Sequence, residues 1–179
     1  ITLEKGDELI GVEMTDGKSE ILLATKDGKA IRFPESQVRD MGRSAKGVKG
    51  LTLGKKDEVI AMSVADPEST ILTITSLGFG KRTQVKEYRT QSRGGKGIIN
   101  IKVTQKNGEA VALKTVSDND EIMLITGKGV IVRCPVKDIR STGRASQGVR
   151  IIKLDEKDKV ASVASVVTEE EAGEEEGGE

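Results

Sequence analysis

A basic, glycine-rich segment carries the densest chemical signal in the sequence. Its three glycines let the backbone come close to a partner and expose N–H groups, while one arginine and one lysine supply positive charge. That combination suits phosphate oxygens. The alternative is a tight turn beside solvated cations, because glycine also tolerates the positive φ angles that turns require. The segment consists of Gln91, Ser92, Arg93, Gly94, Gly95, Lys96 and Gly97.

The segment belongs to a unit that recurs about every 50 residues. Related loops at 42–47 and 143–148 carry arginine and glycine at the same offsets. A turn needs glycine but does not need arginine, so the repetition favours phosphate contact. Self-similarity at this period indicates one supersecondary unit stacked several times. The strongest anchors are Ile21, Thr25, Gly28 and Arg32, which recur as Ile71, Thr75, Gly78 and Arg82 and again as Ile122, Thr126, Gly129 and Arg133.

The charges are sorted by repeat position, although the formal net charge is zero. The segments 28–50, 78–100 and 129–150 hold 17 of the 29 Lys and Arg residues but only 4 of the 29 Asp and Glu residues. Equivalent positions of a repeat array share a face or an edge, so we expect these cations to form a track that neutralises successive phosphates of duplex DNA. The candidate DNA-binding residues are Lys29, Arg32, Arg39, Arg43, Lys46, Lys49, Lys81, Arg82, Lys86, Arg89, Arg93, Lys96, Arg133, Lys137, Arg140, Arg144 and Arg150.

Composition argues against several other kinds of function. The chain has no histidine and one cysteine, so it lacks the commonest general base, the commonest metal ligand and a disulfide framework. Aromatic residues make up 2% of the chain, which argues against base stacking by a reader of single strands or RNA. Tyr88 has no histidine or metal cluster to activate it, and Cys134 is expected to be a small buried apolar residue. We therefore expect no catalytic residue and no metal site.

Each repeat is predicted to form four short β-strands. Asp27-Gly28 is a strong hairpin signal between two of them, and no segment of useful length has helical periodicity. Short, evenly spaced strands with turn residues between them indicate an all-β, propeller-like array with one four-stranded blade per repeat. The expected strands are Glu8–Met14, Glu20–Thr25, Ala30–Phe33 and Val48–Leu53, then Val59–Val64, Thr70–Thr75, Phe79–Thr83 and Ile98–Val103, then Ala110–Val116, Glu121–Thr126, Val130–Arg133 and Val149–Leu154, and finally Asp158–Val167.

The predicted boundaries are 1–50, 51–100 and 101–157 for three blade repeats, 158–168 for a partial closing repeat and 169–179 for a tail. Propellers typically have about four to eight blades, so we expect a partial array or one completed by other blades. The tail contains seven glutamates and no basic residue. It cannot bury apolar surface, so we expect it to be disordered and to compete with DNA for the basic track.

The sequence resembles the C-terminal DNA-wrapping domain of bacterial DNA gyrase A subunits. That family carries a box with the sequence Gln-Arg-Arg-Gly-Gly-Lys-Gly, which residues 91–97 match at six of seven positions, departing at Ser92. Residues 6–12, 80–83 and 99–104 are also similar, and the resemblance covers about residues 1–167. It implies a pinwheel variant of the propeller, in which a hairpin strand is exchanged with the neighbouring blade. The three repeats resemble the last half of that domain.

The resemblance also implies a function and partners. The chain is expected to bind, bend and wrap duplex DNA along a basic outer edge, with general DNA contact by Arg93 and Lys96. It would be a non-catalytic part of an ATP-dependent type II topoisomerase that introduces negative supercoils. The family's cleavage tyrosine lies in the rest of the A subunit, whereas its ATP site lies in the B subunit, so no cofactor is expected here. ATP and Mg²⁺ would act elsewhere. The implied partners are the gyrase B subunit together with the remainder of the gyrase A subunit, in an A2B2 assembly.

Location and two alternatives complete the expectations. A lone thiol fits a reducing cytoplasm, and no apolar run approaches the length of a membrane-spanning helix. The equivalent domain of the topoisomerase IV A subunit, which has degenerate boxes, is one alternative. The other is a protein-interaction propeller of the kelch type, which shares the period and a Gly-Gly pair. Kelch repeats, however, use tyrosine and tryptophan that this chain lacks.

Overall fold

Three β-hairpins, one from each repeat, form the framework of the computed structural model, which describes residues 1–166. A glycine with positive φ closes each hairpin turn, so the Asp27-Gly28 prediction is confirmed and extends to Gly78 and Gly129. The strands are antiparallel, with Ile21 opposite Phe33 in the first hairpin. The hairpins are β1 (Glu20–Thr25) with β2 (Lys29–Pro34), β4 (Thr70–Thr75) with β5 (Phe79–Gln84), and β8 (Glu121–Thr126) with β9 (Ile131–Pro135).

Each sheet is completed by strands from the following repeat. In the first sheet, β3 pairs with β1 and β6 pairs with β2, which gives the order β3-β1-β2-β6. The second sheet has the order β10-β5-β4-β7 and the third the order β11-β8-β9. The predicted repeat boundaries therefore fall within the sheets, because the strands that flank each hairpin come from the next repeat along the chain. These strands are β3 (Val59–Val64), β6 (Ile98–Ile99), β7 (Ala110–Val116), β10 (Val149–Arg150) and β11 (Val160–Val166).

A short 3-10 turn follows the second strand of each hairpin. The turns are η1 (Glu35–Gln37), η2 (Val85–Glu87) and η3 (Val136–Asp138). Proline precedes η1 and η3, and its fixed φ suits the extended residue that begins these turns. The first side chains of η2 and η3 are fully buried, so these turns are fastened to the core. The sequence analysis predicted no regular element here, because turns of three residues leave no periodic signal.

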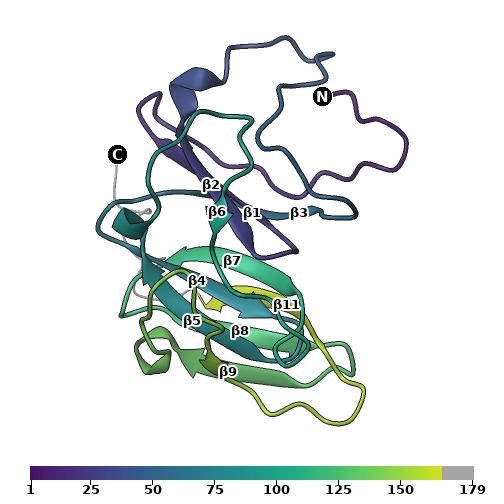
Figure 1. Ribbon diagram of the computed structural model, residues 1–179, viewed down its shortest axis with the longest axis vertical. Coiled ribbons are helices and arrows are strands. Elements are labelled where there is room, and N and C mark those ends of the chain that lie inside the picture. Colours follow the sequence, from purple (N-terminus) through teal and green to yellow (C-terminus); the bar gives the residue numbers. More distant parts are fainter. Residues whose placement is uncertain (167–179) are drawn as a thin grey trace, which may run out of the picture.

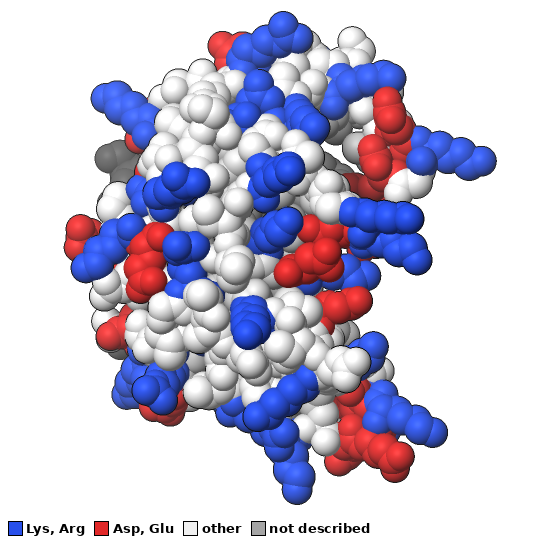
Figure 2. Space-filling model, viewed as in Figure 1, with Lys and Arg blue, Asp and Glu red and all other residues white. Residues whose placement is uncertain are grey.

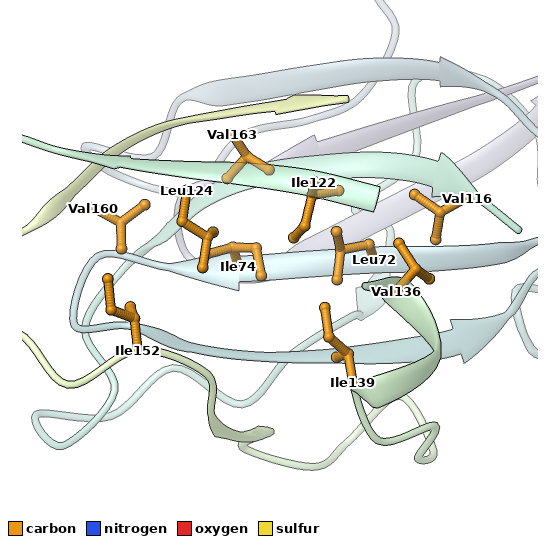
Figure 3. Close-up of a cluster of buried hydrophobic side chains, with 10 residues drawn as sticks. All are labelled: Leu72, Ile74, Val116, Ile122, Leu124, Val136, Ile139, Ile152, Val160 and Val163. Carbon is orange, nitrogen blue, oxygen red and sulfur yellow. The ribbon is translucent and has the colours of Figure 1, made fainter. Parts of the chain in front are cut away.

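The three sheets are stacked along the long axis of the molecule, and apolar clusters fill the spaces between them (Figure 1). Figure 3 shows Leu72 and Ile74 of β4 facing Ile122 and Leu124 of β8. A second cluster packs the first sheet against the middle one through Leu22, Ile71, Tyr88 and Leu113, among others. The core is mostly aliphatic, and it fixes each hairpin relative to the next.

Two predicted strands are not formed. Glu8–Met14 and Val48–Leu53 have no strand structure, and Met14 is 91% exposed. Their counterparts in the second repeat, β3 and β6, pair with the hairpin of the repeat before them. Residues 1–18, all of them described, contain no hairpin, so these two segments have no ladder to join. The fourth strands of the later repeats are also shorter than predicted, at two residues each.

Candidate nucleic-acid interface

Three exposed arginines occupy the same position in the three repeats. Arg39, Arg89 and Arg140 each directly follow the residue that ends a 3-10 turn. In two repeats that preceding residue, Tyr88 or Ile139, is buried in the core. Both have extended backbone angles, and successive side chains of an extended chain point to opposite sides. The core contact of one residue therefore directs the next arginine to solvent.

Eight more of the predicted DNA-binding residues are exposed. Lys46 forms an ion pair with Glu4 at 3.0 Å, and the guanidinium of Arg150 lies 5.3 Å from the centre of the Phe79 ring. Figure 2 shows Lys and Arg side chains over all three sheets on one face, with most Asp and Glu side chains toward its two sides. The eight residues are Arg43, Lys46, Lys49, Lys86, Lys96, Arg133, Lys137 and Arg150.

Arg32 and Arg82 lie between repeats rather than on the surface. Arg32 donates hydrogen bonds to the carbonyls of Val85 and Tyr88, both at 3.2 Å, and Arg82 donates to the carbonyl of Ile139 at 2.7 Å. Each hairpin arginine thus satisfies carbonyls around the 3-10 turn of the next repeat. Their side chains are only 12% and 10% exposed. We therefore remove both residues from the interface that the sequence predicted.

Arg133 is the third member of this series, but its surroundings differ. Within residues 1–166 no further 3-10 turn follows η3, and the Arg133 side chain is 59% exposed. It pairs with Glu121, much as Arg32 pairs with Glu20. The hydrogen bonds that Arg133 donates to Glu121 raise the pKa of Arg133 further, so the guanidinium remains charged. Its exposure leaves it in the candidate interface.

The loop at residues 91–97, called the box loop from here on, packs against the first repeat. The N–H of Gly94 donates to the carbonyl of Gly50 at 2.7 Å. Gly97 has φ of 69°, and a Cβ at that position would lie 2.6 Å from the carbonyl oxygen of Ala30. Gly97 therefore allows close approach to the chain itself, and Gly94 has positive φ and donates its N–H within the chain, which supports the turn alternative for both. Of the two box cations, Lys96 is exposed and Arg93 is half-buried.

Lys81 is fully buried, although it was predicted to contact DNA. Its ammonium donates to the carbonyls of Gly143 and Arg144 at 2.8 and 2.6 Å, beneath the basic loop of the third repeat. The first and third hairpins have Ile31 and Val132 at this position. Burial lowers the pKa of Lys81 to about 8, with the charge of Arg144 acting in the same direction. Lys29 and Arg144, like Arg93, are half-buried.

The buried Lys81 predicts a pH-dependent stability. Between pH 8 and 10 the unfolded lysine holds its proton while the folded one loses it, so the free energy of unfolding should rise with pH. Each pH unit in this window contributes at most about 1.4 kcal/mol, so we expect Lys81 to contribute about 2 kcal/mol to this rise. Lys81→Met should remove this contribution, and Lys86→Met should not. Denaturant titrations at pH 8 and pH 10 measure the free energy of unfolding. An equal rise in Lys81→Met would show that Lys81 is not the group responsible.

The side chains considered for catalysis are packed rather than activated. The Tyr88 hydroxyl donates to Asn100 Oδ1 at 2.5 Å, and burial raises the pKa of Tyr88. Burial also raises the pKa of the Cys134 thiol, which is half-buried beside the core cluster. Among residues 1–166 no group of three or more His, Cys, Asp or Glu side chains is arranged to hold a metal ion. The same residues contain no helix long and apolar enough to cross a membrane.

A family model described as "DNA gyrase C-terminal domain, beta-propeller" matches residues 19–66, 69–117 and 120–166. The chain belongs to the DNA gyrase C-terminal domain family. It is 63% identical over 171 residues to the DNA gyrase A protein of Halalkalibacterium halodurans and 45% identical over 178 residues to that of Staphylococcus aureus. These matches cover 96% and 98% of the chain but 20% of each relative, so the chain spans about a fifth of the length of these gyrase proteins.

Solved structures agree with this family. A gyrase A C-terminal domain superposes with a TM-score of 0.86 at 25% identity, covering 93% of this chain and 57% of that one. A topoisomerase IV C-terminal domain gives 0.87 at 30% identity, covering 92% and 52%. The predicted all-β propeller fold and the resemblance to gyrase are thereby confirmed. Membership of the gyrase C-terminal domain family argues against the kelch alternative. The fold does not separate gyrase from topoisomerase IV, because domains of both superpose on the chain.

The gyrase-family repeat also contains turn anchors that sequence reasoning missed. Asp57 accepts a hydrogen bond from the N–H of Asp27 at 2.9 Å, and Asp158 accepts one from the N–H of Lys128 at 3.2 Å. Both carboxylates are buried, and hydrogen bonds, first from Thr126, lower the pKa of Asp158. The two acids are two repeats apart, with Asn107 between them. Their recurrence at the repeat period was the available signal.

Proposed function

We propose that the chain binds duplex DNA along the edge formed by its exposed cations and holds the duplex curved. The observation that carries this proposal is the solvent-facing arginine after every 3-10 turn, at Arg39, Arg89 and Arg140. Three equivalent positive groups on stacked repeats provide a regular series of phosphate contacts. Membership of the gyrase C-terminal domain family supports DNA as the ligand of this series.

The exposed cations are numerous enough to offset the energy of bending. Of the 17 predicted residues, the interface retains eleven exposed ones, two of which pair with acids. Smooth bending of a short DNA site costs on the order of 1–6 kcal/mol, which a few phosphate contacts would not offset. Within residues 1–166 the other nine form no ion pair, and they can supply contacts along a longer stretch of duplex. Curvature then follows from the arrangement of the repeats.

In the whole protein, the wrapped segment would serve strand passage. We infer that the chain is part of an ATP-dependent type II topoisomerase and that wrapping favours the introduction of negative supercoils. Its partners would be double-stranded DNA, the gyrase B subunit, plus the remainder of the gyrase A subunit, in an A2B2 assembly in the cytoplasm. ATP and Mg²⁺ would act outside this segment. The predicted competition by the acidic tail concerns residues 169–179, which lie outside the described residues.

A salt series of duplex binding tests the proposal. If about six of these nine cations contact phosphates, the logarithm of the association constant should fall with the logarithm of salt concentration with a slope of roughly −5. Fluorescence anisotropy with a labelled duplex measures this slope for the 179-residue chain. A duplex of unrelated sequence should give a similar slope, because phosphate contacts carry no sequence information. Absence of binding at low salt would refute the proposed function.

A further inference from the structure

We propose that Arg93 and Arg144 are positioning residues that hold successive basic loops at a fixed spacing along the DNA-binding edge. This inference rests on the proposed function and assigns these two arginines a role other than phosphate contact. The two residues occupy the same place in the second and third repeats. Each joins its own loop to the preceding repeat through hydrogen bonds to main-chain oxygen.

The contacts of Arg93 span two separate parts of the first repeat. Its Nη1 donates to the carbonyl of Lys49 at 2.5 Å, and its Nε donates to the carbonyl of Gln37 at 3.0 Å. Its main-chain N–H donates to the side-chain oxygen of Gln37 at 2.6 Å. One residue thus fixes the box loop relative to both the end of η1 and the segment after the first basic loop.

Arg144 repeats this arrangement one repeat later. Its Nη1 donates to the carbonyl of Ile99 at 2.8 Å, and its main-chain N–H approaches a carboxylate oxygen of Glu87 at 3.4 Å. Ile99 and Glu87 are the second-repeat counterparts of Lys49 and Gln37. Two of the three hydrogen bonds of Arg93 therefore recur at Arg144, whereas the bond from Nε has no counterpart there among residues 1–166. Lys49 and Ile99 accept through the main-chain carbonyl, so their side chains are free to vary, whereas Gln37 and Glu87 both supply a side-chain oxygen.

Main-chain hydrogen bonds beside each arginine complete the junction. The N–H of Thr52 donates to the carbonyl of Gly95 at 2.7 Å, and in the next repeat the N–H of Lys102 donates to the carbonyl of Ser146 at 2.9 Å. In each repeat the accepting carbonyl lies two residues after the arginine, so the loop is held at both positions. A guanidinium can reach two acceptors at once because its N–H groups form a rigid fork, whereas the ammonium of lysine is a point charge on a flexible stem.

Arg43 provides an internal control for this role. It is the first-repeat counterpart of Arg93 and is exposed, and within residues 1–166 its side chain donates no hydrogen bond. It carries the same charge at the same loop position without joining two loops. Arg93 and Arg144 therefore differ from Arg43 in geometry rather than in charge. Exchange of arginine for lysine separates the two properties.

The test compares the double variant Arg93→Lys/Arg144→Lys with Arg43→Lys. Each variant is bound to a short duplex labelled at both ends, with affinity and salt slope from anisotropy and curvature from energy transfer between the labels. Thermal unfolding of each free variant reports any general loss of stability. For the double variant we expect curvature to be lost and affinity to fall about tenfold, with the salt slope unchanged and the chain still folded. For Arg43→Lys we expect no change in any quantity.

Other outcomes overturn the inference in distinguishable ways. If the double variant bends DNA like the original chain, charge alone matters and the arginines are phosphate ligands. If its salt slope falls by about 0.9 for each arginine, phosphate contacts were lost and the inference is again wrong. A lower unfolding temperature with unchanged curvature indicates a stabilising role only. Should the double variant fail to fold, Arg144→Lys alone is judged by the same criteria. Failure of the original chain to bind at low salt refutes the proposed function instead.

Discussion

Gly78→Ala should destabilise the chain by about 2–4 kcal/mol, whereas Gly129→Ala should cost about 1 kcal/mol. Both glycines close hairpin turns at nearly the same φ, 77° and 85°. A Cβ on Gly78 would lie 2.6 Å from the carbonyl oxygen of Ile152, but a Cβ on Gly129 would meet no atom of the described residues within 4 Å. The difference arises because a segment of the following repeat covers Gly78. The pair therefore separates backbone strain from packing between repeats.

Equilibrium unfolding in denaturant at one pH measures both variants. The carbonyl of Gly78 accepts hydrogen bonds from the N–H groups of Ile151 and Ile152, so a shift of this turn also weakens those bonds. Gly28→Ala should behave like Gly78→Ala, because a Cβ there would clash with the carbonyl of Ile101. Equal destabilisation by Gly78→Ala and Gly129→Ala would show that φ alone sets the cost and that the inter-repeat contact adds little.

Reversing the three equivalent arginines should weaken duplex binding roughly a hundredfold at low salt, about 1 kcal/mol for each residue. Arg39→Glu, Arg89→Glu and Arg140→Glu remove three proposed phosphate contacts, so the salt slope should fall by about 3. All three side chains are exposed, and none forms an ion pair within residues 1–166. The fold should therefore be retained, as circular dichroism can verify.

A charge-matched variant controls for the change in net charge. Lys18, Lys55 and Lys153 are exposed, come from successive repeats and lie outside the basic segments. Their reversal to Glu changes the net charge by the same amount but should reduce affinity much less, with a nearly unchanged slope. Similar losses in both triple variants would mean that long-range attraction, rather than a defined edge, accounts for binding.

The hairpins could be predicted from the sequence because their information is local. Glu20–Thr25, Thr70–Thr75 and Glu121–Thr126 have the predicted bounds, and each is followed within a few residues by a turn glycine. The flanking strands depend on a partner from another repeat. Glu8–Met14 has the composition of a strand but no hairpin among the described residues to pair with, so composition alone led to the wrong prediction there. A strand requires a hydrogen-bonded neighbouring strand, and the sequence of a segment does not show whether that neighbour is present.

The charge pattern of the sequence and the geometry of the folded chain determined different features of the candidate interface. From the sequence alone came the repeat, the all-β fold, the gyrase resemblance and the concentration of cations in three equivalent segments. Only the tertiary structure separated the cations that face solvent from those that join repeats. Arg32 and Arg39 are equally basic and seven positions apart, yet Arg32 is held by carbonyls more than 50 residues away. Carbonyl groups belong to every residue and leave no mark in a sequence, so the partners of a buried arginine are known only once the chain is folded.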